Sequence, residues 1–212
     1  MIRYRSASIP RAGLLLACML LGACSALPDK PARAVVYDFG PGARTAPVAA
    51  APGRPAIWLG EVDAVSALDN TAVLYRLAYA DAQQLQPYAQ ARWAMPPAQL
   101  LRQRLRQSLA QQQPVLRDGD ALQAESGAMR LLQLELDEFS QVFDAPDTSV
   151  GLVRVHATVV SPSDGAGRLL AQRSFVAQRP APSADAAGGV HALAAASDGV
   201  LAEITQWLAT LR

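Results

Sequence analysis

The sequence predicts an α/β domain in which a mixed sheet of about five or six strands is flanked by two principal helices. Apolar and polar residues alternate over 132–137 and again over 153–159, which is the period of strands with one buried face. Leucines recur every four residues over 100–109, and a second amphipathic pattern covers 193–211. Because strand and helix patterns interleave along the chain, we expect helices packed on a sheet.

The first half of the chain alternates short strand patterns with turns and loops. The sequence predicts three strands here, at 34–39, 57–62 and 71–79. The stretch 40–55 is rich in Pro, Ala and Gly and predicts a loop. The helix over 100–109 comes next, with Pro96 and Pro97 in its first turn, where the missing N–H of proline removes no helical hydrogen bond.

The second half of the chain predicts three strands and a final helix. The two alternating segments supply two of these strands, and 169–177 supplies the third. Turn residues at 162–165 join the second and third strands, which predicts an antiparallel hairpin or meander. A loop over 180–189 then leads to the amphipathic helix that ends the chain.

The N-terminus has the pattern of a bacterial lipoprotein signal. Three arginines precede an apolar run over 13–21, and the small residues Gly22 and Ala23 stand directly before Cys24. The apolar run is too short for a transmembrane helix, which needs roughly 20 residues. We therefore predict a signal peptide over 1–23, a tether over 24–33 and a single domain over 34–212.

Cys24 is the predicted lipidation site. Its thiol would carry a diacylglycerol, and its amine, once freed by cleavage, would take a further acyl chain such as palmitate. Two or three chains hold a protein stably at a membrane, whereas one holds it only marginally. Ser25 permits export to the outer membrane, whereas Asp at that position commonly retains lipoproteins in the inner membrane. The alternatives are an ordinary secretory signal with a chance cysteine, and a buried structural cysteine.

Composition argues against several classes of function. Cleavage removes three arginines and changes the formal charge from +1 to −2, so there is no electrostatic case for nucleic acid binding. After cleavage the chain has no thiol besides Cys24, which leaves none for a disulfide, a metal or a nucleophile.

The remaining candidates for chemistry have ordinary interpretations. His156 and His191 have no serine or cysteine placed beside them by a motif, and the pair Gly188–Gly189 lacks the Lys and Ser/Thr of a phosphate-binding loop. We interpret the carboxylates Asp137, Glu138 and Asp144 as a solvated strand edge, not as a metal site. The sequence therefore predicts a protein that is not an enzyme and that has no cofactor and no metal.

Three segments, taken in order behind the signal, resemble the ABC-type transport auxiliary lipoproteins, also described as PqiC-like or YmbA-like. The first runs from Leu74-Tyr75-Arg76 through Tyr88 to the Trp-Ala and prolyl helix start at 93–97. The second is the strand and acidic block at 134–144, and the third is the segment 169–175 before the last helix. The stretch 40–55 departs from the family in being richer in Ala and Pro.

The resemblance implies a three-layer, anticodon-binding-like α/β shape and a non-catalytic role in intermembrane lipid transport. The implied partners are an MCE-domain protein and an ABC or PqiA-type permease, with the lipoprotein docking them at the periplasmic face of the outer membrane, together with further copies of the chain as a homo-oligomer. A structural envelope lipoprotein without lipid cargo is the alternative. A lipid-modifying enzyme is disfavoured, because no nucleophile and base are paired in the sequence.

A group of aromatic and arginine side chains is the candidate interface, since Trp, Tyr and Arg are enriched at protein interfaces. These residues are Tyr75, Arg76, Tyr88, Arg92 and Trp93. The alternative for Trp93 is a core position that anchors the helix start, and the alternative for Tyr75 is a purely structural strand position.

Overall fold

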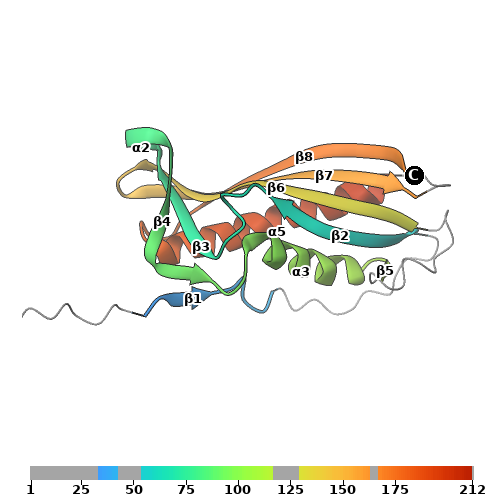
Figure 1. Ribbon diagram of the computed structural model, residues 1–212, viewed down its shortest axis with the longest axis horizontal. Coiled ribbons are helices and arrows are strands. Elements are labelled where there is room, and N and C mark those ends of the chain that lie inside the picture. The colour runs from blue at the N-terminus through green and yellow to red at the C-terminus, as the bar shows by residue number, and fades with distance from the viewer. Residues whose placement is uncertain (1–32, 43–53, 117–128, 163–166, 212) are drawn as a thin grey trace, which may run out of the picture. The chain divides into compact units, whose positions relative to one another are not determined.

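The computed structural model describes residues 33–42, 54–116, 129–162 and 167–211 (Figure 1). Residues from Ala34 onward form one unit, and its buried side chains form one apolar core. The predicted signal peptide, with Cys24 and Ser25, lies outside the described residues, as do most of the tether and of the loop 40–55.

The α/β class is confirmed, with a sheet larger than expected. Eight strands in the described part of the chain form one mixed sheet, in place of five or six. They are β1 (Val35–Tyr37), β2 (Ala56–Ala64), β3 (Ala72–Leu77), β4 (Ala82–Trp93), β5 (Val115–Leu116), β6 (Met129–Ala145), β7 (Thr148–Ser161) and β8 (Arg168–Pro180).

Strand β6 organises the sheet. Along one edge its first half pairs in parallel with β2 and its second half in parallel with β3, so two shorter strands share a single neighbour. Along the other edge β6 pairs with β7, and β7 pairs with β8, both antiparallel. The predicted meander is therefore confirmed. Most of its predicted turn, 162–165, lies outside the described residues.

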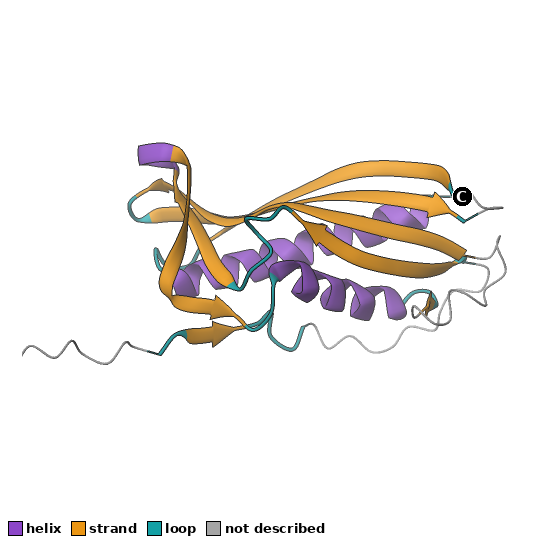
Figure 2. Ribbon diagram, in the orientation of Figure 1, coloured by secondary structure: helices purple, strands orange, loops and turns teal. Residues whose placement is uncertain are grey.

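Three helices of the described part of the chain accompany the sheet: α2 (Ala78–Asp81), α3 (Pro97–Ala110) and α5 (Ala186–Thr210). The two long helices contact each other and lie on the same side of the sheet (Figure 2). The described elements thus form two layers, a sheet and a layer of helices, where the family resemblance implied three. On β7 every second residue from Ser149 to Val159 is buried toward α5, as the alternation predicts.

Helix α5 begins at Ala186, inside the stretch 180–189 that was expected to be a loop. Asp185 caps the helix, because its carboxylate accepts a hydrogen bond of 2.7 Å from the Gly188 N–H. That hydrogen bond, with another from Ser183, lowers the pKa of Asp185. A Cβ on Gly189 would lie 2.1 Å from Gln141 Oε1, so the glycine at this position lets the helix start pack directly on β6.

Strand β4 is the longest element that the sequence pattern does not predict, and α2 and β5 are not predicted either. Strand β3 ends at Leu77 instead of continuing to residue 79. The sequence of β4 is rich in Gln and Ala, contains Pro87 and shows no clean alternation, so its local signal for a strand is weak. It is a strand because of its partners. It pairs antiparallel with β3, and its end at 91–93 pairs in parallel with β1.

Candidate functional site

The hairpin formed by β3 and β4, with α2 at its tip, carries all five candidate interface residues. Tyr75 lies beside Tyr88, with ring centroids 4.6 Å apart, and the edge of its ring faces Phe143 of β6 at 6.2 Å. The Tyr75 hydroxyl donates a 2.9 Å hydrogen bond to Gln86 Oε1 on the paired strand. The structure thus brings the two tyrosines together, half-buried, at the base of the hairpin.

Tyr88 leads into a buried polar network. Its hydroxyl donates a 2.8 Å hydrogen bond to Gln141 Oε1, and Gln141 Nε2 donates at 2.8 Å to Ser149 Oγ. Gln141 is fully buried, so these bonds satisfy both ends of its amide. Burial first, and then the neighbouring Tyr75 and Asp185, raise the pKa of Tyr88 to about 12. The network fixes the hairpin to β6 and to β7.

Arg76 pairs with Glu138 across the β3–β6 junction. Arg76 Nη2 lies 3.1 Å from Glu138 Oε2, and the two side chains are 22% and 14% exposed. The Arg76 guanidinium also donates to the carbonyl oxygens of Ala82 and Gln83 at the start of β4. The interpretation of Glu138 as part of a solvated edge is therefore wrong. Glu138 lies on the central strand, beside a bulge after Leu136.

Arg92 and Trp93 end the hairpin with different roles. Arg92 is half-buried and donates to the carbonyl oxygens of Tyr88 and Ala91 at 2.6 and 2.7 Å. Trp93 is 2% exposed and meets Phe39 and Phe139 edge to face, with centroids 5.7 and 5.5 Å apart. Trp93 is therefore a core residue, and its side chain is not available to a partner.

The exposed aromatic residue of the hairpin is one that the sequence pattern misses. Tyr79 in α2 is 48% exposed, and the first three residues of β4 beside it are exposed as well. The sequence assigned Tyr79 to a strand because it closes an apolar run. The signal that could have found it is the short Ala-Tyr-Ala-Asp segment between two strands, which is a turn at a hairpin tip.

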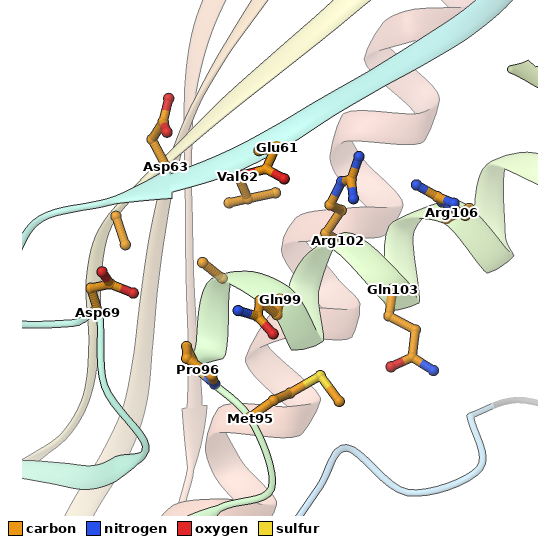
Figure 3. A pocket seen from close by; sticks show the side chains of 12 residues that line it. Glu61, Val62, Asp63, Asp69, Met95, Pro96, Gln99, Arg102, Gln103 and Arg106 are labelled. Atoms are coloured by element: carbon orange, nitrogen blue, oxygen red, sulfur yellow. The ribbon is translucent and has the colours of Figure 1, made fainter. Parts of the chain in front are cut away.

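A groove of about 620 Å³ lies between the end of β2 and α3 (Figure 3). Glu61, Asp63 and Asp69 are among the residues that line it, and Arg102 and Arg106 come from the helix. Arg102 Nε donates a 2.9 Å hydrogen bond to the Gly60 carbonyl, which holds the helix against the strand. Small-molecule sites are mostly apolar, so this open, charged groove does not have the lining of such a site.

The other candidates for chemistry are separate from one another. His156 Nδ1 lies 3.0 Å from Ser174 Oγ on the outer face of the β7–β8 pair, and His191 is exposed on α5. In the described part of the chain no three His, Cys, Asp or Glu side chains are grouped so that they could hold a metal ion. None of the described helices combines the length and apolar character that crossing a bilayer requires.

These observations define an α/β domain with a projecting hairpin that is held at its base by internal contacts and exposed at its tip. The family model for the ABC-type transport auxiliary lipoprotein component matches residues 37–205, and the chain belongs to this family. The family is an auxiliary transport component and not a family of enzymes.

Solved structures support the fold. A Xanthomonas campestris protein, known from a crystal structure, is 21% identical with a TM-score of 0.65, and the match covers 82% of this chain and 94% of that one. The crystal structure of an uncharacterized protein is 16% identical with a TM-score of 0.60, and that match covers 83% and 99%. No curated protein matches the sequence.

Proposed function

We propose that this chain is a non-catalytic, lipid-anchored subunit of an intermembrane lipid transport system. The observation that carries the proposal is the family match over residues 37–205, and the predicted signal peptide over 1–23 with Cys24 after it supports the lipid anchor. Acyl chains on Cys24 would hold the protein at the periplasmic face of the outer membrane, with Ser25 as the sorting residue. Its partners would be an MCE-domain protein and an ABC or PqiA-type permease of the same system.

The tether sets how far the domain reaches from the membrane. Ten residues lie between Cys24 and Val35, the first residue of β1, so eleven Cα–Cα steps separate the two. Fully extended, they span roughly 40 Å at about 3.6 Å per residue. The domain would therefore act close to the bilayer, where it can receive a machine that crosses the periplasm.

The β3–β4 hairpin is the proposed contact with that machine. Tyr79 supplies an exposed aromatic side chain at the tip, the kind of residue that contributes most to binding at interfaces. Tyr75, Arg76, Tyr88 and Arg92 would form the half-buried support behind it. Because Arg76 pairs with Glu138, the hairpin is positioned before a partner binds, which reduces the entropic cost of docking.

Copies of the chain would assemble into a ring around a common axis. A closed ring uses the same contact repeatedly, and many acyl anchors on one ring reinforce one another. Such a ring would offer a collar at the membrane to a periplasmic partner.

Site-specific photo-crosslinking in cells tests the docking proposal. A photoreactive phenylalanine analogue in place of Tyr79 should crosslink to the MCE-domain protein encoded beside this gene. The same analogue in place of Ala202, which is exposed on α5, is the control and should give no such product. Absence of the crosslink at residue 79 would favour the structural lipoprotein without lipid cargo.

The anchor is tested separately by Cys24→Ala. The precursor should remain uncleaved and unacylated, because both processing steps require the thiol of Cys24. Mass spectrometry of the membrane fraction measures this, and mature acylated protein from the variant gene would remove the lipoprotein proposal.

A further inference from the structure

Strand β8 is the longest strand at an edge of the sheet. Among the described strands it pairs with β7 alone, so the backbone N–H and C=O groups along its other side have no sheet partner. Figure 1 shows β8 as the outermost strand of the β6–β7–β8 meander. A long open edge is a template for a further strand, and proteins usually protect such edges.

The side of β8 that faces the helices is basic. Arg173 pairs with Ala157 of β7, and Arg179 pairs with Gly151. These two β7 residues are buried on the face of the sheet that the helices cover, so the arginines lie on that face too. The Arg173 guanidinium lies 5.0 Å from the centre of the Phe175 ring, and the Arg179 guanidinium covers Gly199 of α5. No carboxylate of the described residues forms an ion pair with either arginine.

The opposite side of β8 carries two exposed apolar side chains among the exposed polar residues Gln172, Ser174 and Gln178. Val176 is 46% exposed and Leu169 is 55% exposed. They pair with Arg154 and Val160 on the outer face of β7, away from the helices. Along one edge, therefore, one side of the strand offers two exposed arginines, and the other side offers two exposed apolar side chains with polar residues between them.

We propose that the β8 edge binds an extended segment of a partner protein in which acidic and apolar residues alternate. The segment would add to the sheet as a ninth strand. Main-chain hydrogen bonds would supply affinity, and the alternating side chains would supply specificity. Its acidic residues would face Arg173 and Arg179, and its apolar residues would cover Val176 and Leu169.

A second copy of β8 does not fit this edge. The strand contains Arg168, Arg173 and Arg179 and no acidic residue, so two such edges would bring arginines together without compensating charge. Charged residues on an open edge strand protect it against unwanted pairing, and this role alone would account for the arginines. The same role does not account for the exposed Leu169 and Val176, which a partner strand would cover.

The inference extends the docking role proposed above, and it concerns a different surface from the hairpin. The test uses the full-length protein in mild detergent and a labelled ten-residue peptide of alternating Glu and Val. Fluorescence anisotropy should detect binding, and hydrogen exchange of backbone amides should slow within residues 168–180. A peptide with the same composition in two blocks, five Glu and then five Val, is the control and should bind more weakly.

The double variant Arg173→Gln/Arg179→Gln should weaken binding about two- to thirtyfold, the range expected for two cross-strand charge pairs. The matched double variant Arg54→Gln/Arg106→Gln removes the same charge at positions before β2 and on α3, away from the β8 edge, and should leave affinity within about twofold. Equal binding of the two peptides, or protection outside β8, would overturn strand addition. Self-association protecting β8 without peptide would show that a second copy is the occupant. None of these outcomes changes the expected Tyr79 crosslink. The β8 proposal can therefore be wrong while the hairpin docking proposal stands, and the reverse is also true.

Discussion

Replacing Gly151 by alanine tests the packing of the sheet on its longest helix. Gly151 lies in β7 where α5 crosses the strand, and a Cβ there would lie 2.5 Å from both Ala192 C and Leu193 N. These neighbours are backbone atoms and cannot rotate away. The φ angle of Gly151 is not positive, so alanine is compatible with the strand backbone and the whole effect comes from the contact with α5.

The expected loss of stability is about 1–3 kcal/mol, the usual effect of forcing an extra methyl group into a packed site. Urea unfolding of the full-length protein, followed by circular dichroism, measures it as a lower midpoint with an unchanged slope. In thermal unfolding, a loss of 1 kcal/mol corresponds to a shift of about 2–4 °C for a domain of this size.

Gly60→Ala is the matched control. A Cβ on Gly60 in β2 would meet its nearest neighbour, the Leu132 carbonyl oxygen, at 3.4 Å, which is an ordinary contact. This variant should be neutral, or more stable by about 0.4–1 kcal/mol through the entropy of the unfolded chain. If Gly151→Ala unfolds at the same urea concentration as the unchanged protein, the close approach of α5 and β7 is refuted.

Three further predictions concern the hairpin and the anchor. Tyr88→Phe should lower the free energy of unfolding by about 1–3 kcal/mol, because Gln141 Oε1 loses its hydrogen-bond donor. The folded-state pKa of Tyr88 is raised to about 12, so the unchanged protein should lose stability as the pH rises from about 10 toward 12. A titration that follows tyrosinate absorbance should show this late ionisation in the unchanged protein and not in the variant. Arg76→Ala should destabilise by about 1–2 kcal/mol because Glu138 is left unpaired, and adding Glu138→Gln should recover part of that loss in urea unfolding. Ser25→Asp should move the protein toward the inner-membrane fraction of a sucrose gradient, and unchanged outer-membrane enrichment would exclude Ser25 as the sorting residue.

The sequence predicts the elements whose burial is regular. The alternation at 132–137 and the leucine repeat at 100–109 correspond to the first half of β6 and to α3, because each of these stretches buries one face. Strand β4 and the start of α5 were not predicted. Strand β4 depends on pairing with β3 and β1, which is not local in sequence. The start of α5 depends partly on a non-local contact of Gly189 with Gln141, but its Asp185 cap is a local signal that the sequence interpretation missed.

For the candidate site, the sequence named five residues that lie on the β3–β4 hairpin, but it predicted neither the hairpin nor the role of each residue. Residue type alone does not show that Trp93 faces the core while Tyr79 faces solvent. It also does not show that Glu138 meets Arg76, since the two are far apart in sequence and a bulge after Leu136 sets the position of Glu138. Such pairings are properties of the assembled sheet.

The central claim is that this domain acts through docking, and light scattering of the purified full-length protein in mild detergent tests it most directly. The protein is measured alone and mixed with the MCE-domain protein proposed above as its partner. The account predicts a mass above that of one chain for the protein alone, and a heavier complex in the mixture that Tyr79→Ala weakens. A monomer at tens of micromolar that does not bind this partner would contradict the claim.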